Sequence, residues 1–451
     1  MRRVVRMLAA LLLAGGAAPA LAAGMTTHAL MADLGRQALA DGALKSLLAQ
    51  QRGALLAGAI NPDGGYATGA LFDGDREMAE RAHWEDFNDA FIAHLRALGC
   101  DAQARAALAA WPGNGSSALA AVSARCARLV AFAFGNAAHG LGDEIWDSLF
   151  ETVVRERDLD AAAKVSPLHG EGPHCSVFDA VRDPQALKAA LGRGDDAATA
   201  KALDLAAALS IELAMDMVAI VDQHLWDDDV PLLVFPPVDD LVAAHALNRP
   251  ELGIGAAQVQ RGFMIAKAGL ALERAAALPL APLVRSAMPW ASANYYMNSG
   301  GVVDTAQAIA ALYEHLWAKL LGEPLPIAVA GVHPRNGEAG VPYRAGAAEG
   351  YIRAFTAQSA PESAVERAGV ICLFDEDGRR VEGQTISGIY DPDWGHVINF
   401  TPAADLAPDH RYTVVVTDRL VDQLGQVPRS AYAWSFRTAA ATATTPVARR
   451  R

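Results

Sequence analysis

The chain has 451 residues, of which 52% are hydrophobic, and carries a formal net charge of -13 at neutral pH. This length suggests two or three domains, and the composition is sufficient for a sizeable helical core. The acidic balance and the lack of a long basic patch argue against a protein that binds nucleic acid by neutralising phosphates. We therefore expect no nucleic-acid partner.

The N-terminus predicts export. MRRVVR is basic, MLAALLLAGGAAPALA is apolar, and an A-x-A cleavage signal ends at Ala22. These features are typical of a secretory signal peptide, here residues 1–22, whereas a membrane anchor needs a longer apolar run. A secreted or periplasmic location follows. In an oxidising compartment Cys100 and Cys126 could pair, although spacing alone does not establish connectivity.

Helical periodicity dominates the chain up to Gly322. Helices are expected at 24 to about 57, 78–157, 197–226, 236–247, 256–279 and 303–321. The Gly- and Asp-rich stretch NPDGGYATGALFDGDRE is expected to be a loop. Residues 158–196 contain Pro, Gly and His, and we interpret them as an insertion between helices that could serve as a lid.

The pattern changes after Gly322. Short runs of β-branched residues such as HVINFTP, RYTVVVTDRL and YAWSFRT alternate with turn signals, which is typical of an all-β sandwich over residues 325–438. The tail, 439–451, is expected to be disordered. The predicted protein is therefore multidomain, with a mainly α-helical domain over 23–322 followed by a β-sandwich of Ig-like size. The sequence carries no signal for an oligomeric state.

One stretch of the helical domain, AFAFGNAAHGLGDEIWDSLF, places candidate metal-ligating side chains in a helix that is expected to be buried. His139, Asp143 and Asp147 stand at i, i+4 and i+8, so they lie along one face of a helix, beside a parallel apolar stripe. Because an unpaired buried charge is costly, a divalent metal ion would satisfy all three side chains together. The alternative is a helix face turned to water.

A second stretch, LAAALSIELAMDMVAIV, is apolar on nearly every face and should be a buried helix. Glu212 and Asp216 are its only acidic residues, and they stand at i and i+4. Buried carboxylates pair with cations or coordinate metals. A salt bridge from another segment is the alternative.

The order of TTHALMADLGRQAL, NPDGGY, AHWEDF, FGNAAHGLGDEIWD and a later acidic helix resembles the zinc-dependent phospholipase C family. The local pattern is closest to the catalytic part of glycosylphosphatidylinositol-specific phospholipase D. The resemblance spans about residues 23–226, and H-x-x-x-D flanked by F-G and W is its most specific piece. Separately, HPRNG, FTPAADL, YTVVV and WSFRT resemble bacterial Ig-like domains of the surface-layer type.

The first resemblance implies a metal centre of two or three zinc ions. Four side chains of this chain match the family's first metal site: Asp63, His83, His139 and Asp143. Another implied site shares Asp143 as a bridging ligand and adds His28 and the mature N-terminus, which is Ala23 if cleavage follows Ala22.

The remaining site departs from the family pattern. Asp147 stands where the family commonly has His, and Glu212 and Asp216 stand in place of H-x-x-x-E. Oxygen ligands favour calcium, magnesium or manganese over a nitrogen-rich zinc site, so this site is expected to hold a harder ion or none. A missing nitrogen could come from one of three further histidines: His169, His174 or His224.

The function that the resemblance implies is hydrolysis of a phospholipid or another phosphodiester at a membrane surface. Metal ions clamp phosphoryl oxygens and lower the pKa of bound water, and Asp63 either completes the shell or acts as the general base. The alternatives are a nuclease or phosphomonoesterase on the same fold, and a non-catalytic, metal-stabilised surface-binding protein. The sequence contains neither a G-x-S-x-G elbow nor a Walker A loop.

Overall fold

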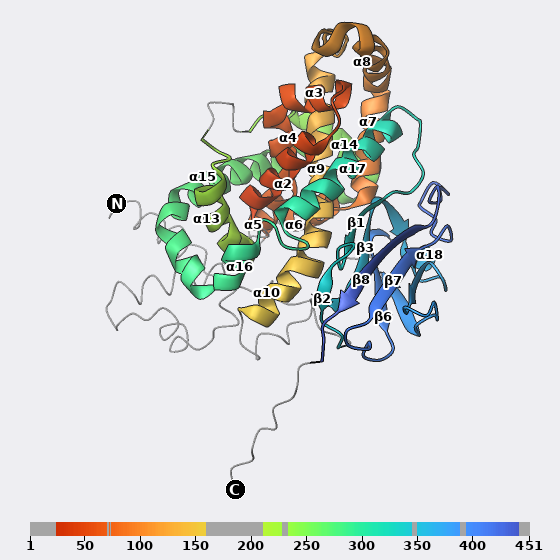
Figure 1. The fold of residues 1–451 in the computed structure, drawn as a ribbon. Helices are drawn as coiled ribbons and strands as arrows, with labels where there is room; N and C mark the ends of the chain where they lie inside the picture. The colour runs from red at the N-terminus through yellow and green to blue at the C-terminus, as the bar shows by residue number, and fades with distance from the viewer. Residues whose placement is uncertain are drawn as a thin grey trace, which may run out of the picture. The chain divides into compact units, whose positions relative to one another are not determined.

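The computed structural model describes residues 24–69, 72, 74–158, 211–227, 233–344, 350–387 and 394–441. The chain divides into two compact units, Met1–Leu325 and Pro326–Arg451 (Figure 1). The predicted signal peptide, Ala23, the 158–196 insertion after its first residue and most of the predicted tail lie outside the described residues.

The described part of the first unit is helical. Its helices are α2 (Met25–Ala38), α3 (Ala43–Gln50), α4 (Arg52–Ala59), α5 (Asn61–Gly69), α6 (Asp75–Ala82), α7 (Glu85–Ala97), α8 (Cys100–Asn114), α9 (Ala124–Ile145), α10 (Thr152–Arg157), α13 (Ile211–Gln223), α14 (Val238–Asn248), α15 (Ala256–Ala287), α16 (Pro289–Asn294) and α17 (Val302–Leu320). A π-helical turn, Trp146–Glu151, joins α9 to α10. Within these residues no single helix is long and apolar enough to cross a membrane, although one bent pair, Cys100–Ala121 with Ala124–Val154, passes by length and composition.

Helix α9 organises this unit, and α4, α17, α7 and α2 pack around it (Figure 1). Phe132 and Phe134 of α9 are fully buried. Gly135 allows the close crossing with α4, because a Cβ atom there would lie 2.0 Å from the carbonyl oxygen of Leu55. The Cys100–Cys126 disulfide forms, with the two Cα atoms 5.3 Å apart, and ties the start of α8 to the start of α9.

The expected loop at NPDGGYATGALFDGDRE is wrong in its first part, since α5 spans Asn61–Gly69. Pro62 and Asp63 lie in the first turn, where a missing N–H and a negative charge both favour a helix. Packing of α5 against α6 and α15 then outweighs the low helix propensity of its glycines. The expected continuous helix from residue 78 is also wrong, because the chain breaks at His83 and Trp84.

The second unit is a sandwich of two four-stranded sheets. Its strands are β1 (Val329–His333), β2 (Ala339–Val341), β3 (Ile352–Pro361), β4 (Ile371–Phe374), β5 (Gly383–Ser387), β6 (Trp394–Pro402), β7 (Arg411–Val416) and β8 (Tyr432–Thr438). The strand orders are β1-β3-β6-β5 and β2-β8-β7-β4. Strand β2 runs parallel to β8, and the other pairs are antiparallel. The two sheets share one apolar core, which includes Ile352, Ile398, Val414 and Trp434.

Candidate metal centre

Four separate segments supply the side chains of the candidate centre. His28 lies in α2, Asp63 in the first turn of α5, His83 between α6 and α7, and His139 and Asp143 one turn apart in α9. All but Asp143 are buried, and the Asp143 side chain is 14% exposed. The structure therefore brings together all five of the described side chains that the phospholipase C resemblance assigned to its first two metal sites.

The break between α6 and α7 positions His83. The residue caps the C-terminus of α6, and the extended backbone of Trp84 then starts α7 in a new direction. Gly140 lets α9 lie directly against this break, because a Cβ atom there would lie 2.1 Å from the carbonyl oxygen of His83. As a result the imidazole rings of His83 and His139 have centroids 4.7 Å apart.

Backbone carbonyls fix the orientation of these two rings. Nδ1 of His83 lies 2.7 Å from the carbonyl oxygen of Ala79, and Nδ1 of His139 lies 2.7 Å from that of Ala59. Because a carbonyl oxygen only accepts, each Nδ1 carries the hydrogen and each Nε2 carries a lone pair. The two Nε2 atoms nevertheless face each other at 3.0 Å. Such a contact requires a cation or a proton between the rings.

A proton is disfavoured at neutral pH. Burial, reinforced by the charge of His139, lowers the pKa of His83 to about 4. Burial, reinforced by His28, also lowers the pKa of His139. A metal ion is the remaining candidate, and imidazoles whose Nδ1–H groups bond to carbonyl oxygens are the usual form of histidine ligands.

Asp143 connects the three imidazoles. Its Oδ1 lies 2.9 Å from Nε2 of His28, whereas its Oδ2 lies 3.2 Å from Nε2 of His139 and 3.6 Å from Nε2 of His83. Burial raises the pKa of Asp143, but the imidazoles of His139 and His28 outweigh burial and hold this pKa well below its usual range. An ionised carboxylate with one oxygen toward His28 and the other toward His139 and His83 fits the bridging role that the resemblance implied.

Asp63 is the side chain that most lacks a partner. It is 5% exposed, and within the described residues neither carboxylate oxygen has a hydrogen-bond partner. Its Oδ1 lies 3.6 Å from Nε2 of His139. Burial, and then the charges of Asp143 and Glu273, raise its pKa well above the usual range. Because buried polar groups are normally paired, this carboxylate is a candidate ligand for a cation.

The donor atoms fit metal ions in two overlapping groups. One group is His28, His139 and Asp143, and the other is Asp63, His83 and His139; within each group the ligand atoms lie within 4.8 Å of one another. This mixture of imidazole nitrogens and carboxylate oxygens is typical of zinc. The described residues can therefore hold metal ions, and zinc as their identity stays a prediction.

A third group contains only carboxylates. Oxygen atoms of Asp147, Glu151 and Glu212 lie within 4.8 Å of one another. Asp147 and Glu212 were expected from the sequence, whereas Glu151 was not. Glu151 stands at i+4 from Asp147, at the end of the π-helical turn before α10. That spacing in a buried acidic run was the available signal. An all-oxygen set suits calcium, magnesium or manganese better than zinc.

Asp216 does not join this carboxylate group, contrary to the expectation. Its Oδ2 accepts a hydrogen bond from the backbone N–H of Thr26 at 2.8 Å, and its Oδ1 accepts from the N–H and the hydroxyl of Thr27 at 2.7 and 2.5 Å. A carboxylate at these first N–H groups of α2 is stabilised by the orphan donors of a helix N-terminus. Burial raises the pKa of Asp216 to about 6, although these hydrogen bonds act in the opposite direction. Asp216 is thus placed to hold α2 rather than a metal.

Glu273 of α15 was not identified from the sequence. It is 5% exposed, and its Oε2 accepts a hydrogen bond from the Thr26 hydroxyl at 3.0 Å. Burial, and then the charge of Asp216, raise its pKa well above the usual range.

His224, one of the three spare histidines, is largely exposed and pairs with Asp227 at 2.8 Å. His169, His174 and Ala23 lie outside the described residues.

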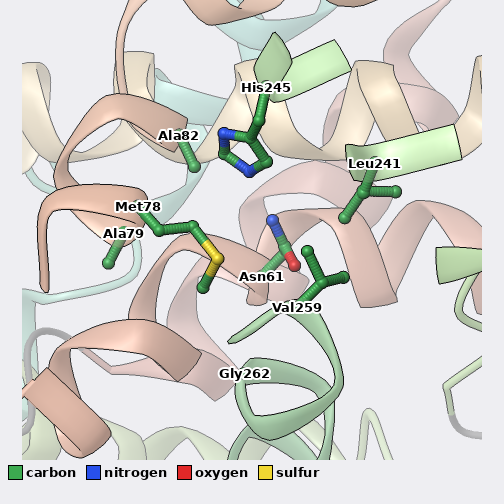
Figure 2. A pocket seen from close by; sticks show the side chains of 8 residues that line it. All are labelled: Asn61, Met78, Ala79, Ala82, Leu241, His245, Val259 and Gly262. Atoms are coloured by element: carbon green, nitrogen blue, oxygen red, sulfur yellow. The ribbon is translucent and has the colours of Figure 1, made fainter. Parts of the chain in front are cut away.

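A small pocket in the same unit is of a different kind (Figure 2). It is lined by Asn61, Met78, Ala79, Ala82, Leu241, His245, Val259 and Gly262. Burial lowers the pKa of His245 to about 4, so its ring is neutral at physiological pH. This lining contains no charged group and shares no side chain with the metal-ligand groups.

Comparison with known proteins identifies the second unit. Residues 324–438 match the family model of the bacterial Ig-like domain. The C-terminal β-sandwich is thus a bacterial Ig-like domain, and the chain joins such a domain to a helical unit. This bears out the Ig-like part of the sequence prediction, whereas the phospholipase C assignment of the helical unit stays a prediction. No curated protein matches the chain.

Solved structures of a surface-layer protein are similar to a limited degree. The structure of surface layer protein SbsC, domains 1-6, is 13% identical with a TM-score of 0.20, and the alignment covers 78% of this chain and 46% of that one. The N-terminal part of the same S-layer protein is also 13% identical with a TM-score of 0.20, over 77% of this chain and 79% of that one. The chain thus spans under half of the six-domain structure, and values this low support no conclusion about fold or function.

Proposed function

We propose that the protein is a secreted, metal-dependent phosphodiester hydrolase of the phospholipase C type. The observation that supports this most directly is the pair of facing Nε2 atoms of His83 and His139, 3.0 Å apart. Beside them lies the carboxylate of Asp63, which accepts no hydrogen bond from the residues that the structure describes. A bound cation would satisfy both features, and both belong to residues that match the motifs of that family.

The chain's own residues prepare the centre. The carbonyl groups of Ala59 and Ala79 hold the rings of His139 and His83 so that their Nε2 atoms point inward. The ionised Asp143 offers an oxygen to either side. Zinc held by these donors would polarise phosphoryl oxygens and lower the pKa of bound water toward about 7.

Asp63 has a second role open to it. Its Oδ1 lies 3.6 Å from Nε2 of His139, and neither carboxylate oxygen has a hydrogen-bond partner among the described residues, so Asp63 is placed to take the proton of an attacking water molecule. The carboxylates of Asp147, Glu151 and Glu212 would hold a harder ion nearby.

Two features support action outside the cytoplasm. Residues 324–438 are a bacterial Ig-like domain, which is in keeping with an extracellular or cell-surface protein. The Cys100–Cys126 disulfide is also in keeping with an oxidising compartment. Both agree with the signal peptide that the sequence predicts.

The test is release of phosphocholine from phosphatidylcholine by the purified mature protein, with and without chelator. We expect release that chelator abolishes and added zinc restores. Absence of release after addition of zinc, calcium or manganese would overturn the phospholipase assignment. Chelator-sensitive activity on single-stranded DNA would then favour the nuclease alternative, and chelator-sensitive activity on p-nitrophenyl phosphate would favour the phosphomonoesterase alternative. Stoichiometric metal without any turnover would favour a binding protein.

A further inference from the structure

The outward side of α15 carries exposed apolar side chains. This helix, Ala256–Ala287, exposes three large apolar side chains: Met264 is 62% exposed, Leu272 36% and Leu278 76%. At about 100° per residue the three directions fall within an arc of about 120°. The opposite side of the helix carries buried residues such as Phe263 and Leu270 and packs against α5 and α13. In Figure 1, α15 runs along the margin of the helical unit.

The exposed charges on this helix are all positive. Glu273 is its only acidic residue and is buried. Of its four cations, Arg261 is paired with Asp75 at 2.6 Å and Arg285 is paired with Asp222.

Lys267 and Arg274 differ from these paired arginines. The Lys267 ammonium lies 5.1 Å from the centre of the Phe235 ring, and Arg274 donates to the Trp226 carbonyl oxygen at 3.2 Å. Among the described residues neither has a carboxylate partner. They stand at i and i+7, so they project from the same edge of the helix. Two cations that meet no carboxylate in the described part of the chain therefore flank the exposed apolar side chains, on a chain whose net charge is -13.

We infer that this side of α15 docks on an anionic phospholipid surface. The side is defined by Met264, Lys267, Leu272, Arg274 and Leu278, and is called the α15 outer face below. A helix that shows apolar residues together with Lys and Arg on its exposed side is suited to lie in the plane of a membrane interface. Anionic head groups attract the cations, and the apolar side chains enter the acyl boundary. This inference goes beyond the proposed function, because adsorption to a membrane requires no hydrolysis.

Vesicle flotation of the full mature protein tests the inference. We expect binding to vesicles of phosphatidylcholine mixed with phosphatidylglycerol, weak binding to phosphatidylcholine alone, and loss of binding as salt is raised. The measurement is repeated in chelator, which stops metal-dependent hydrolysis but leaves the α15 outer face intact. Binding that persists in chelator while phosphocholine release is absent in all conditions would contradict the proposed function and still support the membrane surface.

Variants identify the face. Replacing both cations, Lys267→Gln with Arg274→Gln, should weaken binding to the anionic vesicles about 30-fold, from the usual contribution of two cations near such a surface. The matched control, Arg411→Gln with Arg429→Gln, changes the net charge equally at exposed positions of the Ig-like domain and should leave binding unchanged.

A second pair of variants tests the apolar side chains of the α15 outer face. Leu278→Ser should weaken binding, whereas Leu108→Ser, at a residue 42% exposed on α8, should not. Circular dichroism checks that each variant is folded. Equal vesicle binding by the wild type and both α15 variants would overturn the inference. So would self-association of the wild type, seen by sedimentation, that the α15 substitutions abolish, because the face would then bind a second copy of the chain.

Discussion

The Nε2 atoms of His83 and His139 face each other at 3.0 Å while both Nδ1 atoms lie 2.7 Å from backbone carbonyl oxygens. The backbone of α4 and α6 thus sets the tautomer and the direction of both rings through Ala59 and Ala79. Fixed lone pairs that converge on one point are the condition for binding a metal with little reorganisation.

Removal of a central ligand should abolish metal binding and activity together. His139→Ala removes a donor shared by both nitrogen-containing groups, and Asp143→Ala removes the carboxylate that faces all three imidazoles. We expect each variant to lose at least about 100-fold in phosphodiester hydrolysis, since even supporting residues of metal sites cost up to that much. Bound metal is measured by mass spectrometry. His224→Ala, at an exposed histidine, is the control and should keep both properties.

Asp63→Asn should raise the stability of the metal-free protein but reduce the stabilisation that zinc provides. In metal-free protein the raised pKa of Asp63 means that the folded state holds the proton more tightly than the unfolded state, so stability decreases as pH rises above about 4. The variant lacks this penalty and should be about 1–3 kcal/mol more stable than the wild type at neutral pH in chelator. With zinc, the wild type should gain the larger increase in Tm. An identical response of both proteins to zinc would remove Asp63 from the site.

Glu212→Gln and Asp216→Asn distinguish a ligand from a structural carboxylate. Glu212 shares the carboxylate group with Asp147 and Glu151, so Glu212→Gln should lower calcium or manganese content and change Tm little. Asp216 accepts hydrogen bonds at the start of α2, so Asp216→Asn should lower stability by about 1–3 kcal/mol and leave metal content unchanged. The reverse pattern would restore the ligand role that the sequence suggested for Asp216. Isothermal titration with each metal and a thermal melt are sufficient.

Loss of the disulfide should destabilise the helical unit. Cys100 and Cys126 are separated by 26 residues, and closing a loop of this size stabilises a fold by about 3 kcal/mol. Cys100→Ser with Cys126→Ser should therefore lower the free energy of unfolding by about that amount in a urea titration. Cys372→Ser, at the buried free cysteine, is the control, and reducing agent should lower the stability of this control but not that of the double variant.

His245 should make the protein sensitive to mild acid. Burial lowers its pKa to about 4, from the usual 6.5, so between these values the unfolded state binds more protons than the folded state. Burial of the neutral ring costs no stability above pH 6.5. As pH decreases toward 4 the free energy of unfolding decreases, by about 2 kcal/mol at pH 5. His245→Leu should flatten the stability profile by this amount. Parallel profiles of variant and wild type would show that the His245 ring gains access to water.

Residues that are close in sequence made much of the candidate site predictable. His139 and Asp143 could be paired because four residues separate them on a helix, and that relationship holds in any fold that keeps α9. The role of a carboxylate could not be predicted where its hydrogen-bond partners come from a distant segment of the chain. Nothing in the run around Asp216 shows that the N–H groups of Thr26 and Thr27 would meet it. Strand β3 was likewise missed, because nearly all of its residues are buried and no alternation marks it.

The sequence by itself determined the helical first unit, the Ig-like second unit and the local spacing of the metal-ligand candidates, because periodicity and turn chemistry are properties of neighbouring residues. Only the tertiary structure decided which donors meet. The backbone break at His83, the close approach that Gly140 allows and the hydrogen bonds from Ala59 and Ala79 place two rings from distant segments 3.0 Å apart at Nε2. Such contacts depend on helix packing across the core, and no pattern of neighbouring residues encodes that packing.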